Sequence, residues 1–132
     1  MTLSGDERAQ LIKHRIEKSN LLKKEAVFLI DSGLYNTAVN RIYYAMYHAV
    51  SALALKDSFT TSKHLQLIGW FNREYVKTGK AEINSGKYLM RAFEMRSKSD
   101  YDDFADYSEK EVKELMDNLD SFLQIVEKLI QN

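Results

Sequence analysis

The sequence contains no cysteine and no proline, and it has only five glycines among 132 residues. Without cysteine the chain cannot form disulfides, thiolate metal sites or a cysteine nucleophile. No apolar run reaches the ~18 to 20 residues that cross a bilayer, and the N-terminal residues lack the basic and apolar regions of a secretion signal. We therefore expect a cytoplasmic protein that does not insert into membranes.

The scarcity of proline and glycine, in a chain dense in leucine, alanine, lysine and glutamate, favours helices joined by short connections. No alternation of apolar and polar residues extends far enough to predict a strand. With 132 residues and 45% hydrophobic content, the chain is long enough for one domain with a self-supporting core. The predicted fold is a single all-α domain over residues 1–132, an up-and-down bundle of about five helices.

Apolar periodicity and capping residues place the helices along the chain. Gly33 is expected as a left-handed cap after the first helix, and Ser108 with Glu111 forms a capping box before the last. The predicted helices span about Asp6–Asp31, Leu34–Lys56, a third segment from N-cap residues Thr60–Ser62 to Thr78–Gly79, about Ala81–Lys98, and the segment that follows Ser108.

The charged side chains cancel overall, nineteen basic against nineteen acidic, but they are segregated along the chain. Residues 56–98 hold nine Lys or Arg against four Asp or Glu, whereas residues 99–132 hold three against ten. Such a distribution can attract a polyanion to one surface and a basic protein to another. The alternative is that these charges only solvate helix faces.

The second predicted helix carries cations and phenols on one face. At 100° per residue, Arg41, Tyr44 and His48 share this face, which makes them candidate residues for binding an anionic substrate. In the alternative, Arg41 pairs with an acid from another helix, His48 is hydrogen-bonded inside the bundle, and the tyrosines are core aromatics. The opposite face is an apolar stripe suited to packing, formed by Val39, Ile42, Met46, Val50 and Leu53.

The segment from Arg96 to Phe104 is expected to be a turn between the fourth and fifth helices, where polar side chains can converge. Arg96 could bind a phosphate bidentately, and Tyr101 could donate a hydrogen bond or stack on a base. A tyrosine with a pKa near 10 is a poor base at neutral pH. The alternative role for Arg96 is an ion pair with Asp100 at the i, i+4 spacing of a helix end.

No pattern of metal ligands or of phosphate-binding glycines stands out. The histidines show no zinc-binding spacing, and the glycines are isolated. The acidic residues Asp100, Asp102, Asp103 and Asp106 suit Mg²⁺ or Ca²⁺ but lack the spacing of a calcium loop, and negative charge before a helix complements its dipole. We expect no metal site and no cofactor.

Four sequence blocks nevertheless occur together in a familiar order. They are Asn40–Met46 (Asn-Arg-Ile-Tyr-Tyr-Ala-Met), Ser62-Lys63-His64, Tyr75–Gly79, and Arg96 followed by Asp100–Phe104. The combination resembles the HEPN domain, a prokaryotic helical-bundle family often encoded beside a minimal nucleotidyltransferase. The resemblance covers nearly the whole chain, and it implies a bundle that commonly forms homodimers. It also implies a group in which many members are metal-independent RNases, or toxins neutralised by a nucleotidyltransferase.

The chain departs from this family at the residues that carry catalysis. The RNases use an arginine followed, after about four to six residues, by a histidine, at the position that corresponds to Arg96 onward. Here Tyr101 stands after four intervening residues, so the imidazole that supplies general acid-base catalysis is missing from this segment. In some members the partner transfers AMP to a tyrosine two residues after that histidine. The matching residue here is Asp103, which cannot accept AMP.

The leading hypothesis is a HEPN-type protein that binds RNA or a nucleotide and acts as the toxin-like member of a toxin–antitoxin or defence pair. Its site would consist of Arg96 and Tyr101 as the candidate catalytic residues, with Arg41, Tyr44, His48 and Asp100 binding the substrate. Its partners would be a second copy of the chain and a nucleotidyltransferase antitoxin. The alternatives are a non-catalytic dimeric interaction module and a metal-independent endoribonuclease that uses Tyr101 in place of the histidine.

Overall fold

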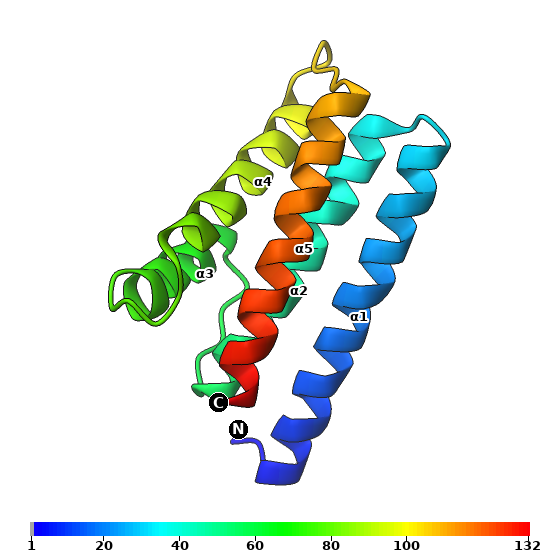
Figure 1. Ribbon diagram of the computed structural model, residues 1–132. Helices are drawn as coiled ribbons and strands as arrows, with labels where there is room; N and C mark the ends of the chain where they lie inside the picture. The colour runs from blue at the N-terminus through cyan, green and yellow to red at the C-terminus, as the bar shows by residue number, and fades with distance from the viewer. Residues whose placement is uncertain (1) are drawn as a thin grey trace.

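The structure is a computed structural model that describes residues 2–132. Figure 1 shows the four long helices lying side by side, with successive helices running in opposite directions and the short α3 in the connection between α2 and α4. No strand occurs among the described residues, and the predicted all-α bundle is confirmed. The elements in chain order are α1 (Gly5–Asp31), α2 (Tyr35–Lys56), α3 (His64–Phe71), the π-helical turn η1 (Asn72–Val76), α4 (Ile83–Tyr101) and α5 (Glu109–Gln131).

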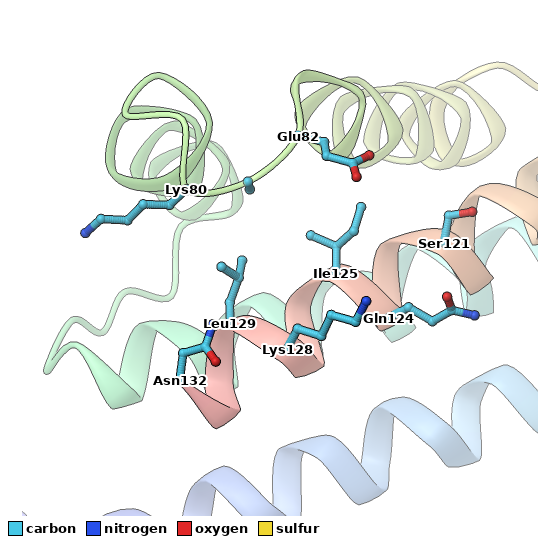
Figure 2. A pocket seen from close by; sticks show the side chains of 9 residues that line it. Lys80, Glu82, Ser121, Gln124, Ile125, Lys128, Leu129 and Asn132 are labelled. Carbon is cyan, nitrogen blue, oxygen red and sulfur yellow. The ribbon is translucent and has the colours of Figure 1, made fainter.

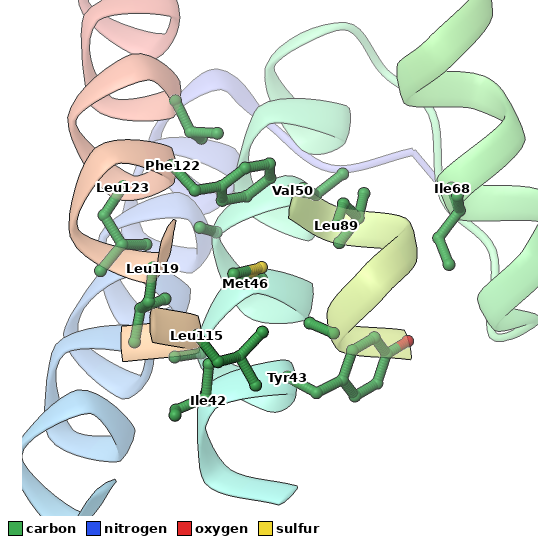
Figure 3. Close-up of a cluster of buried hydrophobic side chains, with 14 of the residues drawn as sticks. Ile42, Tyr43, Met46, Val50, Ile68, Leu89, Leu115, Leu119, Phe122 and Leu123 are labelled. Atoms are coloured by element: carbon green, nitrogen blue, oxygen red, sulfur yellow. The ribbon is translucent and has the colours of Figure 1, made fainter. Parts of the chain in front are cut away.

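Helix α2 is the centre of the bundle, because it packs against α1, α3, α4 and α5. Its predicted apolar stripe, from Val39 to Leu53, is fully buried. Figure 3 shows Met46 and Val50 of α2 facing Phe122 and Leu119 of α5 in this core. Burying such a stripe on three sides stabilises a helix far more than its intrinsic propensity does. No helix within residues 2–132 is long and apolar enough to cross a membrane.

Two of the predicted helix ends are confirmed in detail. Gly33 adopts a positive φ of 76°, and the adjacent amide of Leu34 donates to the carbonyl of Leu29 at 2.8 Å, which closes α1 with a left-handed turn. At the start of α5 the Ser108 side chain accepts from the amide of Glu111, while the Glu111 side chain accepts from the amide of Ser108. This is the predicted capping box.

The predicted start of the third helix is wrong. The cap position is occupied by Lys63, which makes no side-chain capping bond, and the helix begins at His64. The Thr61 hydroxyl instead accepts from the Lys63 amide at 3.1 Å and donates to the Gln66 side chain at 2.8 Å. These local bonds hold the chain in a turn before the helix, so the helix begins later than the hydroxyl-rich segment suggests.

The predicted turn over residues 96–104 is also wrong in its first half. Helix α4 continues to Tyr101, so Arg96 lies on a helix and not in a turn. The Arg96–Asp100 ion pair, with Nε and Oδ2 2.9 Å apart at i, i+4 spacing, supports this last turn of helix. The connection to α5 is correspondingly shorter, and within it the Asp102 side chain accepts from the amide of Phe104 at 2.9 Å.

The π-helical turn η1 brings the chain back so that α4 can pack beside α3. Gly86 of α4 lies against Asn72, the first residue of η1, so closely that a Cβ at Gly86 would sit 2.5 Å from the Asn72 Oδ1 atom. A side chain at Gly86 would therefore require the Asn72 amide to move. The turn ends before Gly79, which has a φ of 80° and stops the segment where the sequence predicts.

Candidate functional site

Arg96 lies at the centre of a partly exposed cluster between α2 and α4. Its Nη2 donates to the Tyr44 hydroxyl at 2.9 Å, and its Nε lies 2.9 Å from the Asp100 carboxylate. The guanidinium carbon also lies over two aromatic rings, 5.2 Å from the centroid of Tyr44 and 5.7 Å from that of Tyr43. Of the predicted site residues, Arg96, Tyr44 and Asp100 are therefore brought together, with Asp100 fixing the arginine.

The cluster includes a histidine from a third element, His64 at the first position of α3. Its Nδ1 lies 2.6 Å from the Tyr43 hydroxyl. Burial raises the pKa of Tyr43, and burial and then the charge of Arg96 lower the pKa of His64. Both groups are thus uncharged at neutral pH, and a single hydrogen bond joins the Tyr43 hydroxyl to Nδ1, with the donor set by the tautomer of the imidazole.

Aromatic rings form the wall around these polar groups. The His64 ring stacks on Tyr47 with centroids 4.6 Å apart and an interplanar angle of 26°. Tyr44 meets the edge of His64 at 5.9 Å, and Phe93 of α4 meets Tyr43 at 5.7 Å. We call Tyr43, Tyr44, Tyr47, His64, Phe93, Arg96 and Asp100 the Arg96 site.

The Arg96 site has the chemistry to hold a phosphate and a base. A guanidinium has five N–H donors, and Tyr44 and Asp100 engage only two of its nitrogens. The Arg96 side chain remains 20% exposed, so the other donors can reach a ligand. Tyr44 and Tyr47 are half-buried and present ring surface on which a nucleobase can stack.

Sequence reasoning missed the proximity of His64 to Arg96, because 32 residues separate them in the chain and only tertiary packing joins them. The available signal was the Ser62-Lys63-His64 block, which in the sequence contributes only to the family resemblance. An imidazole is therefore present near Arg96, although it comes from α3 and not from the residues that follow Arg96.

Tyr101 lies apart from the contacts of the Arg96 site. It follows Arg96 by five positions on a continuous helix, which places it ~140° away around the helix axis. Its side chain is 86% exposed. The predicted convergence of Arg96 and Tyr101 requires a turn between them. Because the helix continues to Tyr101, the two side chains point in different directions.

Arg41 is engaged by another helix. Its Nη1 donates to the Asn40 side chain at 2.7 Å, and its Nε lies 3.6 Å from a carboxylate oxygen of Glu25 on α1. It lines a shallow hollow beside Phe28 of α1. Arg41 therefore pairs with an acid from another helix, as the alternative interpretation of this residue predicts. No hydrogen bond within residues 2–132 connects it to Arg96.

His48 lines a different hollow, of about 420 Å³, between α1, α2 and the segment before α3. Its neighbours there include Arg15 and Lys18 of α1. Burial, followed by the charges of Lys18, Arg15 and His14, lowers the pKa of His48 to about 4. His48 is therefore neutral at pH 7 in a cationic environment.

Because the pKa of His48 is lowered in the folded protein, we expect the protein to lose stability in mild acid. The pKa of His48 is about 6.5 in the unfolded chain and about 4 in the folded one, so only the unfolded state gains a proton between these values. The contribution of neutral His48 to the free energy of unfolding is therefore complete above pH 6.5 and is lost as the pH falls toward 4. Between pH 7.5 and 5 we expect the free energy of unfolding in urea to fall by about 1–2 kcal/mol more in wild type than in His48→Gln. The His14→Gln variant is the control, and equal pH dependence in wild type and His48→Gln would contradict the assignment.

A further hollow, of about 450 Å³, lies between α5 and the residues before α4. Figure 2 shows Lys80 and Glu82 on one side of it and, on the other, Leu129 of α5 and Asn132 just after this helix. This hollow is at the N-terminal end of α4, whereas Arg96 is near its C-terminal end. Its lining mixes both charges with apolar residues, and none of the lining residues belongs to the Arg96 site.

The chain is similar in sequence to known proteins over nearly its whole length. A sequence model of the HEPN domain matches residues 12–129. A protein of Thermotoga maritima named UPF0332 protein is 36% identical over 127 residues, which is 96% of each chain. A UPF0332 protein of Archaeoglobus fulgidus is 33% identical over 83% of this chain and 87% of its own length. A protein of Methanocaldococcus jannaschii that is named as a candidate toxin is 30% identical over 87% of this chain and 78% of its own.

Proposed function

This chain belongs to the HEPN domain family, and from that premise we propose that it is a toxin-like protein that binds RNA or a nucleotide at the Arg96 site. In this proposal Arg96 holds a phosphate, and Tyr44 and Tyr47 stack on a base. Asp100 keeps the guanidinium in place, and His64 hydrogen-bonds the ligand through Nε2. The toxin-like role is supported by the relatives named as candidate toxins.

One observation carries the proposal. A partly exposed guanidinium lies against two tyrosine rings while most of its N–H donors remain available. A cation held in place beside stacking surfaces is the arrangement by which proteins bind single-stranded nucleic acid and nucleotides. Because Asp100 and Tyr44 already orient Arg96, little side-chain entropy is lost when a phosphate binds.

Binding is proposed in preference to RNA cleavage because no histidine follows Arg96 in the chain. The imidazole near Arg96 belongs to His64, whose Nδ1 is engaged with the Tyr43 hydroxyl at 2.6 Å and is not available to a substrate hydroxyl. Tyr101, the candidate replacement for the missing histidine, is directed away from Arg96 on the helix. The endoribonuclease alternative would need one of these groups to rearrange.

We propose the same partners that the family resemblance implies, a second copy of the chain and a nucleotidyltransferase. Leu21 and Phe28 support a protein contact, because these apolar residues lie seven positions apart on α1 and are 59% and 69% exposed. Exposed apolar side chains in such a stripe are typical of protein interaction surfaces. The nucleotidyltransferase rests on the family resemblance alone.

The proposed function is tested by binding of a fluorescent ten-nucleotide single-stranded RNA, and of a fluorescent AMP, measured by anisotropy with a chelator present. We expect RNA binding by wild type with a Kd of roughly 10⁻⁴ to 10⁻⁶ M at physiological salt. Replacing Tyr44 by alanine should weaken binding by about 1–3 kcal/mol through lost stacking. The control is Tyr101→Ala, which makes the same chemical change at an exposed position and should leave affinity within about twofold.

Two results would overturn the proposal. The first is a wild-type protein that binds neither probe. The second is an equal effect of the Tyr44 and Tyr101 substitutions on affinity, because the site would then not involve the tyrosines of α2.

A further inference from the structure

The hollow that contains His48 carries the positive charge of two side chains, Arg15 and Lys18. Its lining includes His14, Arg15 and Lys18 of α1 together with His48, and it includes no carboxylate. None of the ion pairs within residues 2–132 involves Arg15 or Lys18. Its volume of about 420 Å³ is enough for a phosphate with its sugar. Such a lining matches an anion and repels a cation.

The hydroxyls at its rim add donors for the same kind of ligand. Ser51 of α2 and Ser62 before α3 line the hollow. Thr61 lines it too, but its hydroxyl proton is donated to Gln66. Ser62 is exposed and Thr61 is half-buried. Hydroxyl and cationic donors together are the usual contacts to phosphate and sugar oxygens in nucleic-acid complexes.

Tyr47 connects this hollow to the Arg96 site. It lines the hollow, and its ring stacks on His64 at 4.6 Å and meets the edge of Tyr44 at 6.0 Å. Tyr44 in turn accepts from Arg96. A row of aromatic rings therefore lies between two cationic groups, one at Arg96 and the other in the hollow.

We infer that the hollow is a second phosphate-binding subsite, so that the ligand is a single-stranded RNA chain of several nucleotides and not a mononucleotide. The inference rests on the proposed function of the Arg96 site. Along α2, Ser51 follows Tyr44 by seven positions, a rise of ~10 Å, which is the length of about three stacked nucleotides at ~3.4 Å each. Phosphates would bind at the two cationic ends, and the bases between them would stack on Tyr44 and Tyr47.

The double variant Arg15→Gln/Lys18→Gln tests the subsite. Its binding is compared with that of wild type by anisotropy, using fluorescent AMP and a fluorescent ten-nucleotide RNA at several salt concentrations. We expect the affinity for the RNA to fall at least tenfold and the affinity for AMP to stay within twofold. The slope of log K against log salt should become shallower by about 1.4, since two phosphate contacts on a single strand are lost.

The matched control is Lys77→Gln/Lys87→Gln, which removes the same charge from exposed positions outside the hollow. Equal losses of RNA affinity in the two double variants would overturn the inference, because nonspecific electrostatic attraction between the protein and RNA would then explain the effect. An unchanged RNA affinity in Arg15→Gln/Lys18→Gln would overturn it as well. Because Arg15 is half-buried, the single variant Lys18→Gln, at an exposed position, is measured too and should lose about threefold to fivefold in RNA affinity.

These outcomes are distinguishable from a failure of the proposed function. If wild type binds neither AMP nor RNA, the Arg96 site itself is disproved. If wild type binds both and the hollow variants bind RNA as well as wild type does, only the second subsite is disproved.

Discussion

Replacing Arg96 by alanine should lower the affinity for single-stranded RNA by about 30- to 150-fold, as measured by anisotropy. A hydrogen-bonded contact to a charged group contributes about 1.5–3 kcal/mol, and a guanidinium also contributes its stacking on Tyr43 and Tyr44. Arg96 is the one lysine or arginine among the residues that form the Arg96 site, so no other charge of the site replaces it. This is the largest effect on function that we expect from one substitution.

The matched control is Asp100→Asn, which breaks the same ion pair but keeps the guanidinium. That variant should bind RNA within about threefold of wild type, because removing a negative charge that competes with the phosphate offsets the loss of the carboxylate that orients the guanidinium. Both variants should keep the helical circular dichroism of wild type, since Arg96 is partly exposed and lies on the surface of α4. Wild-type affinity in Arg96→Ala would refute the proposed role of the arginine.

Replacing Phe122 by alanine should lower the free energy of unfolding by about 3–5 kcal/mol. Phe122 of α5 is fully buried and packs against Phe71 of α3 with ring centroids 5.7 Å apart. Truncation would leave a cavity where α5 meets α3, and a well-packed core relaxes only partly around such a cavity. Urea unfolding followed by circular dichroism measures the change.

The control for this substitution is Phe104→Ala. Phe104 lies in the connection between α4 and α5 and is 93% exposed, so the same chemical change should alter stability by no more than about 0.5 kcal/mol. A loss of less than about 1 kcal/mol in Phe122→Ala would show that the contact between α3 and α5 is not part of a tightly packed core.

The helices could be predicted from the sequence because their signals are local. The apolar stripe of α2 repeats at helical spacing, and the capping box of Ser108 and Glu111 lies within four residues. The end of α4 was placed too early because its last turn is polar and depends on the Arg96–Asp100 pair. The start of α3 was misplaced because Thr61 satisfies the backbone in a turn before the helix.

The candidate site could be predicted only in part, because some of its contacts depend on tertiary packing and not on local sequence. Arg96, Asp100 and Tyr44 were identified by their chemistry, and Arg96 and Asp100 are neighbours on one helix. The role of His64 depends on where the connection between α2 and α4 returns to the bundle, which no local pattern specifies. Arg41 and Tyr44 share a helical face in the sequence, yet Arg41 pairs with Glu25 of α1 while Tyr44 pairs with α4.

The central claim is that RNA lies across the tyrosines of α2 between Arg96 and the cationic hollow. Photo-crosslinking of a short RNA that contains 4-thiouridine, followed by mass spectrometry of the crosslinked peptides, tests this claim most directly. We expect adducts on the peptides that contain Tyr44, Tyr47 and His64. Adducts confined to other surfaces of the protein, with none on these peptides, would contradict it.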